Sequence, residues 1–259
     1  MKAIQEDTSL SASAPRFTSS RVRASDWVFD DLAERICKVD LVPGASISES
    51  ELAAHYGVSR TPVRAAIASL ADNDLVRVRP QVGTRVSLID LDEVAQAQFI
   101  RESLETNALR YACEADDRDF SVIEATIAEQ HRIAKTGDPE AFFLADEAFH
   151  RQTFELAGYG GAWSVVGRRR FQLDRIRRLS IRPPQPHKLE ELCYEHEEIV
   201  QHILNRDTER AVEKLRIHIR RYIIDSPALR QAYPSYFVGK RFGPAEFVKV
   251  NEASVSLGG

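Results

Sequence analysis

The chain has 259 residues, of which 43% are hydrophobic, and its 35 basic and 39 acidic side chains give a formal net charge of −4. This length allows two domains with buried cores, and no apolar run approaches the length of a membrane span. Three cysteines, Cys37, Cys113 and Cys193, lie far apart without metal-type pairing, which favours reduced thiols over a disulfide framework. These features predict a soluble cytoplasmic protein.

Residues 1–20 are rich in Ser, Ala and Thr, contain acidic residues and lack a central apolar block. They fit neither a signal peptide nor a transit peptide, and we expect a disordered tail. A domain over residues 21–90 then begins with a helix over residues 25–39. Val28, Leu32 and Ile36 of this helix share one face with Phe29.

Residues 47–72 have the pattern of two helices joined by a tight turn. Ser48 and Glu51 have capping-box spacing at the start of the first helix, and Gly57 ends it. Ser59 is a suitable N-cap for the second helix, and Pro62 lies in its first turn, where a missing N–H costs nothing.

The second helix has two different faces. Val63, Ile67 and Leu70 recur at helical spacing and predict a buried stripe. Arg60 and Arg64 stand four residues apart and project from another face near the start of the helix. Their guanidinium groups suit guanine edges or phosphates, as expected of a helix that enters the major groove of DNA.

Alternating residues predict two strands, 75–79 and 84–88, joined by a turn over residues 80–83. Residues 57–86 hold five arginines against Asp72 and Asp74, a local balance of +3 within an acidic chain. Because this positive charge is small, we expect tight DNA binding to need two copies of the domain, as in a dimer. Any small helical domain can contain two helices with solvated arginines, but the attached two-stranded wing favours DNA binding.

This region resembles the winged-helix signature of the GntR superfamily of bacterial transcription regulators. The resemblance rests on the segments Leu41–Gly44, Glu51–Ala53, Gly57–Arg64, Leu70, Leu75–Val76 and Gly83. It implies a homodimer that binds an inverted-repeat DNA operator. Carried over by position, the DNA contacts fall on Ser59, Arg60, Thr61, Arg64 and Gly83, with Ser50 at a position where some members have arginine. Ala65 departs from the family by replacing a common glutamate.

Beyond Leu91 the pattern changes to amphipathic helices, which predict an antiparallel helical bundle over residues 91–226. The expected helices cover residues 91–115, 118–136, 138–158, 160–181, 188–205 and 207–225. From Pro227 the helical pattern dissolves, and residues 227–259 are expected to form a C-terminal tail. The predicted fold class is therefore mainly α, a winged helix-turn-helix followed by a bundle.

Four polar residues fall on inward faces of this bundle. Asp146 and His150 stand one helical turn apart, and His196 and His218 each lie on an apolar stripe. Three buried imidazoles and one carboxylate are suitable ligands for a divalent transition metal. The alternative is that each histidine is a hydrogen-bonded core residue without a metal.

The same positions resemble the metal-binding pattern of the FadR-type effector domain, the FCD domain. The resemblance implies a zinc, nickel or manganese ion that helps to hold a small carboxylate effector, and it places Arg101 opposite that effector. Alternatively, Arg101 is an exposed arginine paired with Glu105. Arg175 and Arg178 lie on one side of the expected helix 160–181 and are further candidates for binding a carboxylate.

Three functions are compatible with these patterns. The first is a ligand-responsive transcription regulator without enzymatic activity, such as a repressor of a catabolic operon. The second is a helical metal-dependent hydrolase or oxygenase fused to a winged domain. The third is an architectural DNA-binding protein without an effector, which the inward polar cluster disfavours. A metal with nearby arginines predicts a charged effector such as a sugar acid, hydroxy acid or dicarboxylate.

Overall fold

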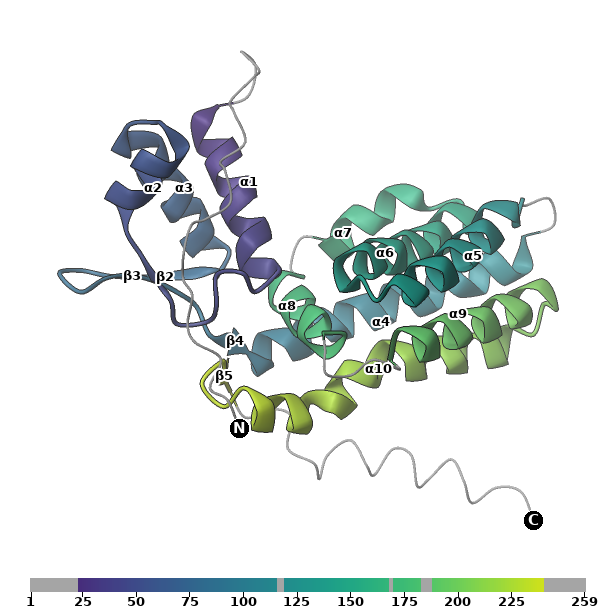
Figure 1. The fold of residues 1–259 in the computed structure, drawn as a ribbon. Helices are drawn as coiled ribbons and strands as arrows, with labels where there is room; N and C mark the ends of the chain where they lie inside the picture. Colours follow the sequence, from purple (N-terminus) through teal and green to yellow (C-terminus); the bar gives the residue numbers. More distant parts are fainter. Residues whose placement is uncertain (1–22, 116–118, 168–169, 183–187, 240–259) are drawn as a thin grey trace. The chain divides into compact units, whose positions relative to one another are not determined.

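The structure is a computed structural model that describes residues 23–115, 119–167, 170–182 and 188–239. The chain divides into two compact units. The N-terminal unit runs to Ile89 and also includes Tyr233–Val238, and the second unit contains Asp90–Ala232. Figure 1 shows helices with a β-hairpin in the first unit, and a helical bundle in the second.

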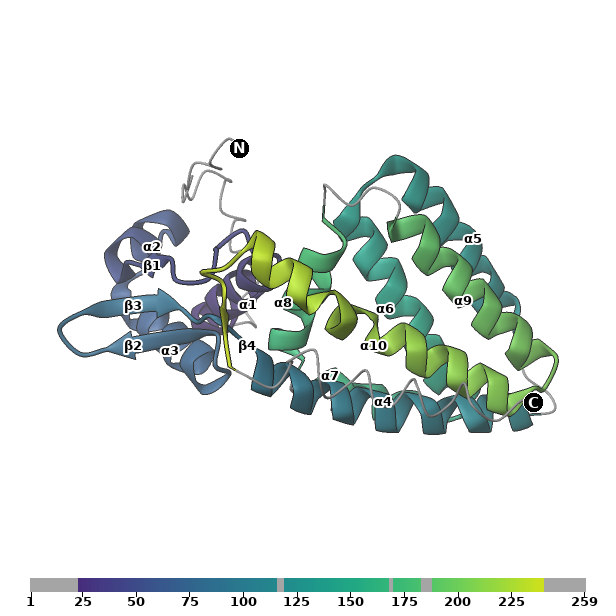
Figure 2. The same ribbon diagram turned by 90° about the horizontal axis from the view of Figure 1, so that it is seen from below.

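The N-terminal unit is a winged helix-turn-helix. Its elements are α1 (Ala24–Cys37), β1 (Ser46–Ile47), α2 (Glu49–Tyr56), α3 (Arg60–Asp72), β2 (Val76–Arg79) and β3 (Gly83–Val86). The strands form an antiparallel sheet in the order β1-β3-β2, and Figure 2 shows β2 and β3 as a projecting hairpin. The sequence did not predict β1, because two residues are too short to show an alternating pattern.

Local signals set the helix boundaries of this unit as expected. The Ser48 hydroxyl accepts a hydrogen bond from the Glu51 N–H at 3.3 Å, which caps α2. Gly57 ends α2 with φ of 64°, a left-handed conformation that glycine adopts without steric cost. The predicted stripe of Val63, Ile67 and Leu70 is buried, with α1 packed against α3.

The second unit is a helical bundle built from long amphipathic helices. Its elements are α4 (Leu91–Glu114), α5 (Ser121–Thr136), α6 (Pro139–Leu156), the 3-10 turn η1 (Gly160–Ala162), α7 (Trp163–Gly167), α8 (Phe171–Ser180), α9 (Lys188–Leu204) and α10 (Thr208–Ala232). Helices α4, α5, α6, α9 and α10 pack along one another around an apolar core (Figure 2). The mainly helical fold class and the bundle are therefore confirmed.

Two predicted boundaries were wrong. The helix expected over residues 160–181 is interrupted, with η1 and α7 before a separate α8, because Gly160, Gly161 and Gly167 lower its helix propensity. The helix expected to end at residue 225 continues through Pro227 to Ala232 as α10. Proline weakens a helix interior, but Ala228–Ala232 contains good helix formers that continue the helix beyond it.

Residues 227–239 do not form the expected tail, because they contain the end of α10 and a short strand. β5 (Phe237–Val238) pairs with β4 (Ile89–Asp90) in a two-stranded sheet. The Ile89 N–H donates to the Tyr236 carbonyl oxygen at 2.8 Å, and the rings of Tyr233 and Tyr236 stack. The expected tail residues 1–20 and the end of the chain from residue 240 lie outside the described residues.

Candidate DNA-binding surface and metal centre

The six residues predicted to contact DNA are all exposed. They lie at the start of α2 (Ser50), at the start of α3 (Ser59, Arg60, Thr61 and Arg64) and at the tip of the β2–β3 hairpin (Gly83). Gly83 has φ of 116°, which favours glycine and lets the chain turn tightly at this tip. Ser59 occupies the N-cap position of α3 without a side-chain capping bond, so its hydroxyl does not cap the helix.

The two arginines of α3 have different surroundings. Arg64 donates from Nε to Glu49 Oε2 at 2.7 Å, joining the N-terminal part of α3 to the first residue of α2. The Arg64 side chain nevertheless remains 66% exposed. Arg60 forms no ion pair with any of the described residues within 4.0 Å.

The wing adds three arginines that share one face of the sheet. Arg77 lies opposite Arg85, and Arg79 lies opposite Gly83, while Val76, Thr84 and Val86 on the other face are buried. The three arginines line a hollow of about 300 Å³, where Arg85 also donates to the Gly44 carbonyl oxygen. The alternating sequence Val76–Arg79 contained this signal, but the predicted contacts did not include these arginines.

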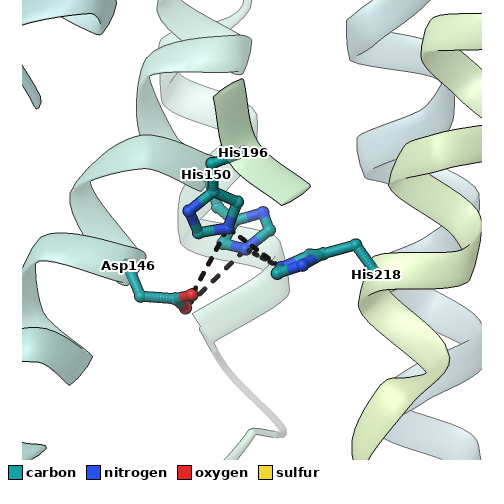
Figure 3. Close-up of side chains that lie close together, drawn as sticks. All are labelled: Asp146, His150, His196 and His218. Carbon is teal, nitrogen blue, oxygen red and sulfur yellow. Dashed lines mark hydrogen bonds and ion pairs between the residues drawn. The ribbon is translucent and has the colours of Figure 1, made fainter. Parts of the chain in front are cut away.

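In the second unit, the structure brings together the four predicted metal ligands. Asp146 and His150 come from α6, His196 from α9 and His218 from α10 (Figure 3). One donor atom of each lies within 4.8 Å of the others, and all four residues are buried. The Phe149 ring stacks on the His196 ring at a centroid distance of 4.0 Å and covers the cluster on that side.

Hydrogen bonds on the outer side of each ring determine its tautomer. Gln130 donates from Nε2 to the Ala145 carbonyl oxygen, so its Oε1 atom faces His196 Nδ1 at 2.8 Å and must accept a proton. His218 Nδ1 donates to the Glu195 carboxylate at 2.8 Å, and His150 Nδ1 lies 2.6 Å from the Glu105 carboxylate in an ion-pair contact. In their neutral forms, His196 and His218 therefore carry the proton on Nδ1 and the lone pair on Nε2, and the carboxylate beside His150 Nδ1 favours the same tautomer.

These three Nε2 atoms point at one another. His196 Nε2 lies 3.0 Å from His218 Nε2, which lies 3.3 Å from His150 Nε2. Two nitrogens bound to one ion at about 2.1 Å lie roughly 3.0 Å apart at a right angle and roughly 3.4 Å apart at a tetrahedral angle. The Asp146 oxygens lie 3.5 Å and 3.7 Å from His196 and His150. The donor set therefore fits a divalent transition metal, and Gln130, Glu105 and Glu195 are supporting residues that the sequence analysis missed.

The electrostatics favour the protonation states that metal binding requires. Burial lowers the pKa of His150 and lowers that of His196 further, so both rings are neutral near pH 7. Burial by itself would raise the pKa of Asp146, but His150 and Arg177 more than offset this effect and hold it below its usual range. A carboxylate and neutral imidazoles are the forms that bind metal ions.

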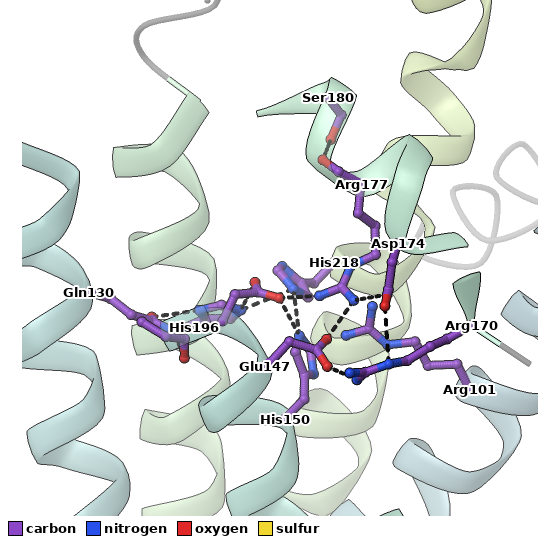
Figure 4. A network of polar contacts seen from close by, with 12 residues as sticks. Arg101, Gln130, Glu147, His150, Arg170, Asp174, Arg177, Ser180, His196 and His218 are labelled. Carbon is purple, nitrogen blue, oxygen red and sulfur yellow. Dashed lines mark hydrogen bonds and ion pairs between the residues drawn. The ribbon is translucent and has the colours of Figure 1, made fainter. Parts of the chain in front are cut away.

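A network of buried charges surrounds the cluster (Figure 4). Arg177 of α8 binds Asp146 and also donates to Glu147 at 2.6 Å and to Asp174 at 3.1 Å. Arg101 donates to Glu105 at 2.5 Å, and both side chains are buried. Arg101 therefore pairs with Glu105, as one alternative predicted, but it is buried rather than exposed.

A cavity of about 40 Å³ opens beside these residues. Its polar lining includes Arg101, Asp146, Arg177, His218 and Arg221, and its apolar lining includes Phe142 and Phe143. Of the three predicted effector-binding arginines, only Arg101 lines it. The predicted Arg175 is fully buried and donates to Gln172, whereas Arg178 binds Glu140 through two hydrogen bonds. The break before α8 changes the helix register from which these two residues were chosen, and Arg177 lies at the cavity instead.

Comparisons with known proteins match both units. Residues 24–86 match the family of bacterial regulatory proteins named gntR, and residues 96–221 match the FCD domain. An HTH-type transcriptional regulator from an unstable DNA locus of Streptomyces ambofaciens is 35% identical over 221 residues, which covers 85% of this chain and 92% of the relative. The chain belongs to the GntR family of bacterial regulatory proteins.

Other relatives of this GntR-family protein agree in architecture. The HTH-type transcriptional repressor RspR of Escherichia coli K12 is 27% identical over 78% of this chain and 91% of its own. The solved structure of E. coli McbR/YncC has a TM-score of 0.65 at 20% identity, covering 82% of this chain and 99% of that one. A GntR regulator from Rhodococcus sp. RHA1 has a TM-score of 0.63 at 20% identity and covers 81% of this chain and 98% of its own. These two structures support the fold.

Family membership decides between the functions that the sequence allowed. This GntR-family protein is a DNA-binding transcriptional regulator and not a metal-dependent hydrolase or oxygenase. The gntR match contains all six predicted DNA contacts, and the FCD match contains Asp146 and the three clustered histidines. Among the described helices, none combines the length and apolarity that a membrane span requires.

Proposed function

We propose that this regulator is a homodimeric, ligand-responsive repressor of a catabolic operon. Its winged units bind an inverted-repeat operator through Ser50, Ser59, Arg60, Thr61, Arg64 and Gly83. Its FCD domain holds a zinc, nickel or manganese ion together with a small carboxylate effector. Binding of the effector changes operator affinity, because a ligand that prefers one conformation of the dimer biases every equilibrium linked to that conformation.

The observation that carries the effector-domain proposal is the convergence of three Nε2 atoms beside the Asp146 carboxylate, each of which carries a lone pair when its ring is neutral with the proton on Nδ1. Three lone pairs that face one another in a buried site repel each other unless a cation lies between them. Asp146, His150, His196 and His218 would hold that cation. A bound metal would supply positive charge with open coordination positions for an anionic ligand.

The arginines beside the cavity support a carboxylate effector. Arg101 and Arg177 both line the cavity, but carboxylates of this chain already engage them. A volume of about 40 Å³ is enough for a few water molecules, and typical ligand pockets are several times larger. We therefore infer that the effector carboxylate replaces Asp146 as the anionic partner of Arg177. Sugar acids, hydroxy acids and dicarboxylates have the required charge.

The charge distribution supports DNA binding as a dimer. The local balance of +3 on residues 57–86 is small beside the chain's net charge of −4. Two such surfaces on one operator double the number of phosphate contacts and of released counterions. The repressor RspR of E. coli, which aligns over most of this chain, supports repression rather than activation.

The proposal is tested with the full-length protein and an operator selected from random DNA. Operator affinity is measured after chelator treatment, after adding back zinc, nickel or manganese, and with a panel of organic acids. We expect at least one acid to weaken operator binding only in metal-loaded protein, and His196→Ala to abolish this response. The control His202→Ala removes a histidine outside the cluster and should retain it. A response that survives chelation and His196→Ala would overturn the metal-linked effector site.

A further inference from the structure

The two arginines of the recognition helix α3 are held differently. Arg64 donates from Nε to Glu49 Oε2, whereas Arg60 has no ion-pair partner among the described residues. Glu49 is the first residue of α2, where Ser48 caps the helix, so its carboxylate projects from a fixed backbone position. The contact therefore ties the orientation of Arg64 to the helix that precedes the recognition helix.

The atom that Glu49 engages determines what Arg64 can bind next. A guanidinium group presents two forked edges, one formed by Nε with a terminal nitrogen and one formed by the two terminal nitrogens. Glu49 occupies Nε and so removes the first edge from use. The second edge remains for a bidentate contact with O6 and N7 of guanine, and the Arg64 side chain is 66% exposed.

The carboxylate also changes the charge that Arg64 presents. Glu49 offsets the positive charge of Arg64 and repels phosphate oxygens, so the pair gains less from non-specific backbone contact than a lone arginine does. Arg60 keeps its full charge and freedom of rotation. Within one helix, the pair therefore favours base reading by Arg64 and leaves Arg60 able to bind either a base or a phosphate.

We propose that Glu49 is a positioning residue that orients Arg64 toward a guanine and thereby sets operator specificity. This inference rests on the proposed DNA-reading role of α3. The competing explanation is that Glu49 only stabilises the N-terminus of α2, where negative charge is favourable. Glu51 lies in the same helical turn, is exposed and has no ion pair within the described part of the chain, so it is a matched control for charge alone.

The experiment compares wild type with Glu49→Ala, Glu49→Gln, Glu51→Gln, Arg64→Ala and the double variant Glu49→Ala/Arg64→Ala. Affinity is measured for the selected operator, for operators with each guanine pair replaced, and for random DNA. Circular dichroism verifies folding, which these exposed or half-exposed positions should not disturb. The ratio of operator affinity to substituted-operator affinity gives the specificity at each position.

We expect Glu49→Ala to lower that ratio by about fivefold per half-site at one guanine pair, the scale of an exposed ion pair. Affinity for random DNA should rise. Glu49→Gln keeps an oxygen acceptor for Arg64 Nε and should retain most of the specificity ratio. Glu51→Gln should raise the affinity for random DNA but leave the specificity ratio unchanged. In the Arg64→Ala background, Glu49→Ala should not lower the ratio further, because it acts through Arg64.

Three results would overturn the inference. An unchanged ratio in Glu49→Ala, while Arg64→Ala lowers it, would reject the role of Glu49 and leave DNA reading by α3 intact. An equal loss in Glu51→Gln would show that charge at the helix N-terminus accounts for the effect. If Arg64→Ala itself keeps the ratio at every position, the assignment of Arg64 to a base fails, and the role of Glu49 fails with it.

Discussion

His196 Nε2 lies 3.0 Å from His218 Nε2 in the core of the bundle, and Gln130 and Glu195 accept hydrogen bonds from the Nδ1 atoms, so both Nε2 atoms carry lone pairs when the rings are neutral. Such an arrangement is unfavourable without a cation between the rings. Because Gln130 and Glu195 set the tautomers of these rings from outside the cluster, they should also affect the affinity of the cluster for a metal.

Removing a tautomer-setting partner should weaken metal binding. Glu195→Ala deprives His218 Nδ1 of its acceptor, and we expect a loss of about 10- to 100-fold in metal affinity. Competition with a chromophoric chelator measures this change. Glu198→Ala is the matched control, because Glu198 is on the same helix and pairs with Lys214 at the surface. Equal affinities in the two variants would contradict the supporting role of Glu195.

Metal-free protein should lose stability as the pH falls below about 6.5. Burial lowers the pKa of His150 and His196 in the folded state, so the unfolded chain binds more protons in this range and unfolding becomes easier. Each histidine contributes at most about 1.4 kcal/mol per pH unit. The pKa of Glu105 is lowered to about 2, so its stabilising effect disappears only below about pH 4.5.

Thermal unfolding in chelator between pH 7.5 and 5.5 measures this histidine effect. His196→Gln should make the decline in melting temperature shallower, whereas His55→Gln, in the winged unit, should leave it unchanged. A wild-type slope in His196→Gln would show that the buried histidines do not cause the decline.

Shortening either arginine of α3 should reduce operator preference. We expect Arg60→Ala and Arg64→Ala each to cost about 1–3 kcal/mol per half-site where the arginine binds a base through two hydrogen bonds, and twice that in a symmetric dimer. Footprinting on the selected operator measures this cost. Arg110→Ala is the control, because Arg110 lies on α4, is half-exposed and pairs with Glu209. Unchanged footprints in both α3 variants would contradict the assignment of the recognition helix.

The wing arginines should contribute affinity without sequence preference. Arg77→Ala removes one exposed charge from the arginine face of the sheet, and we expect it to weaken operator and random DNA equally. The slope of log affinity against log salt should decrease by about 0.9 for each phosphate that the variant no longer neutralises. An unchanged salt slope would place Arg77 away from the DNA.

Effector binding should depend on Arg177 rather than Arg178. Arg177→Lys keeps the charge but loses the bidentate fork at the cavity, so stabilisation by an organic acid should weaken while operator binding without effector persists. Arg178→Lys is the control, because Arg178 is as buried as Arg177 and is its neighbour on α8, but pairs with Glu140. Thermal shift with the acid compares the two. A greater loss in Arg178→Lys would instead favour the arginine chosen from the sequence.

The sequence determined much of the winged unit because its signals are local. The cap at Ser48, the left-handed turn at Gly57 and the stripe from Val63 to Leu70 each depend on residues within a few positions of one another. Helical periodicity also placed Asp146, His150, His196 and His218 on inward faces. Residue spacing within single helices was therefore sufficient to nominate all four candidate ligands.

The tertiary structure decided the features that need contacts between distant segments. Only packing brings Gln130 beside His196 and Glu49 beside Arg64, because these partners lie on different helices and no periodic pattern relates them. The break before α8 changed which arginine reaches the cavity, since a helix interrupted by glycines does not keep its register. Helical spacing can predict which side of one helix is buried, whereas partners across helices depend on how the helices pack.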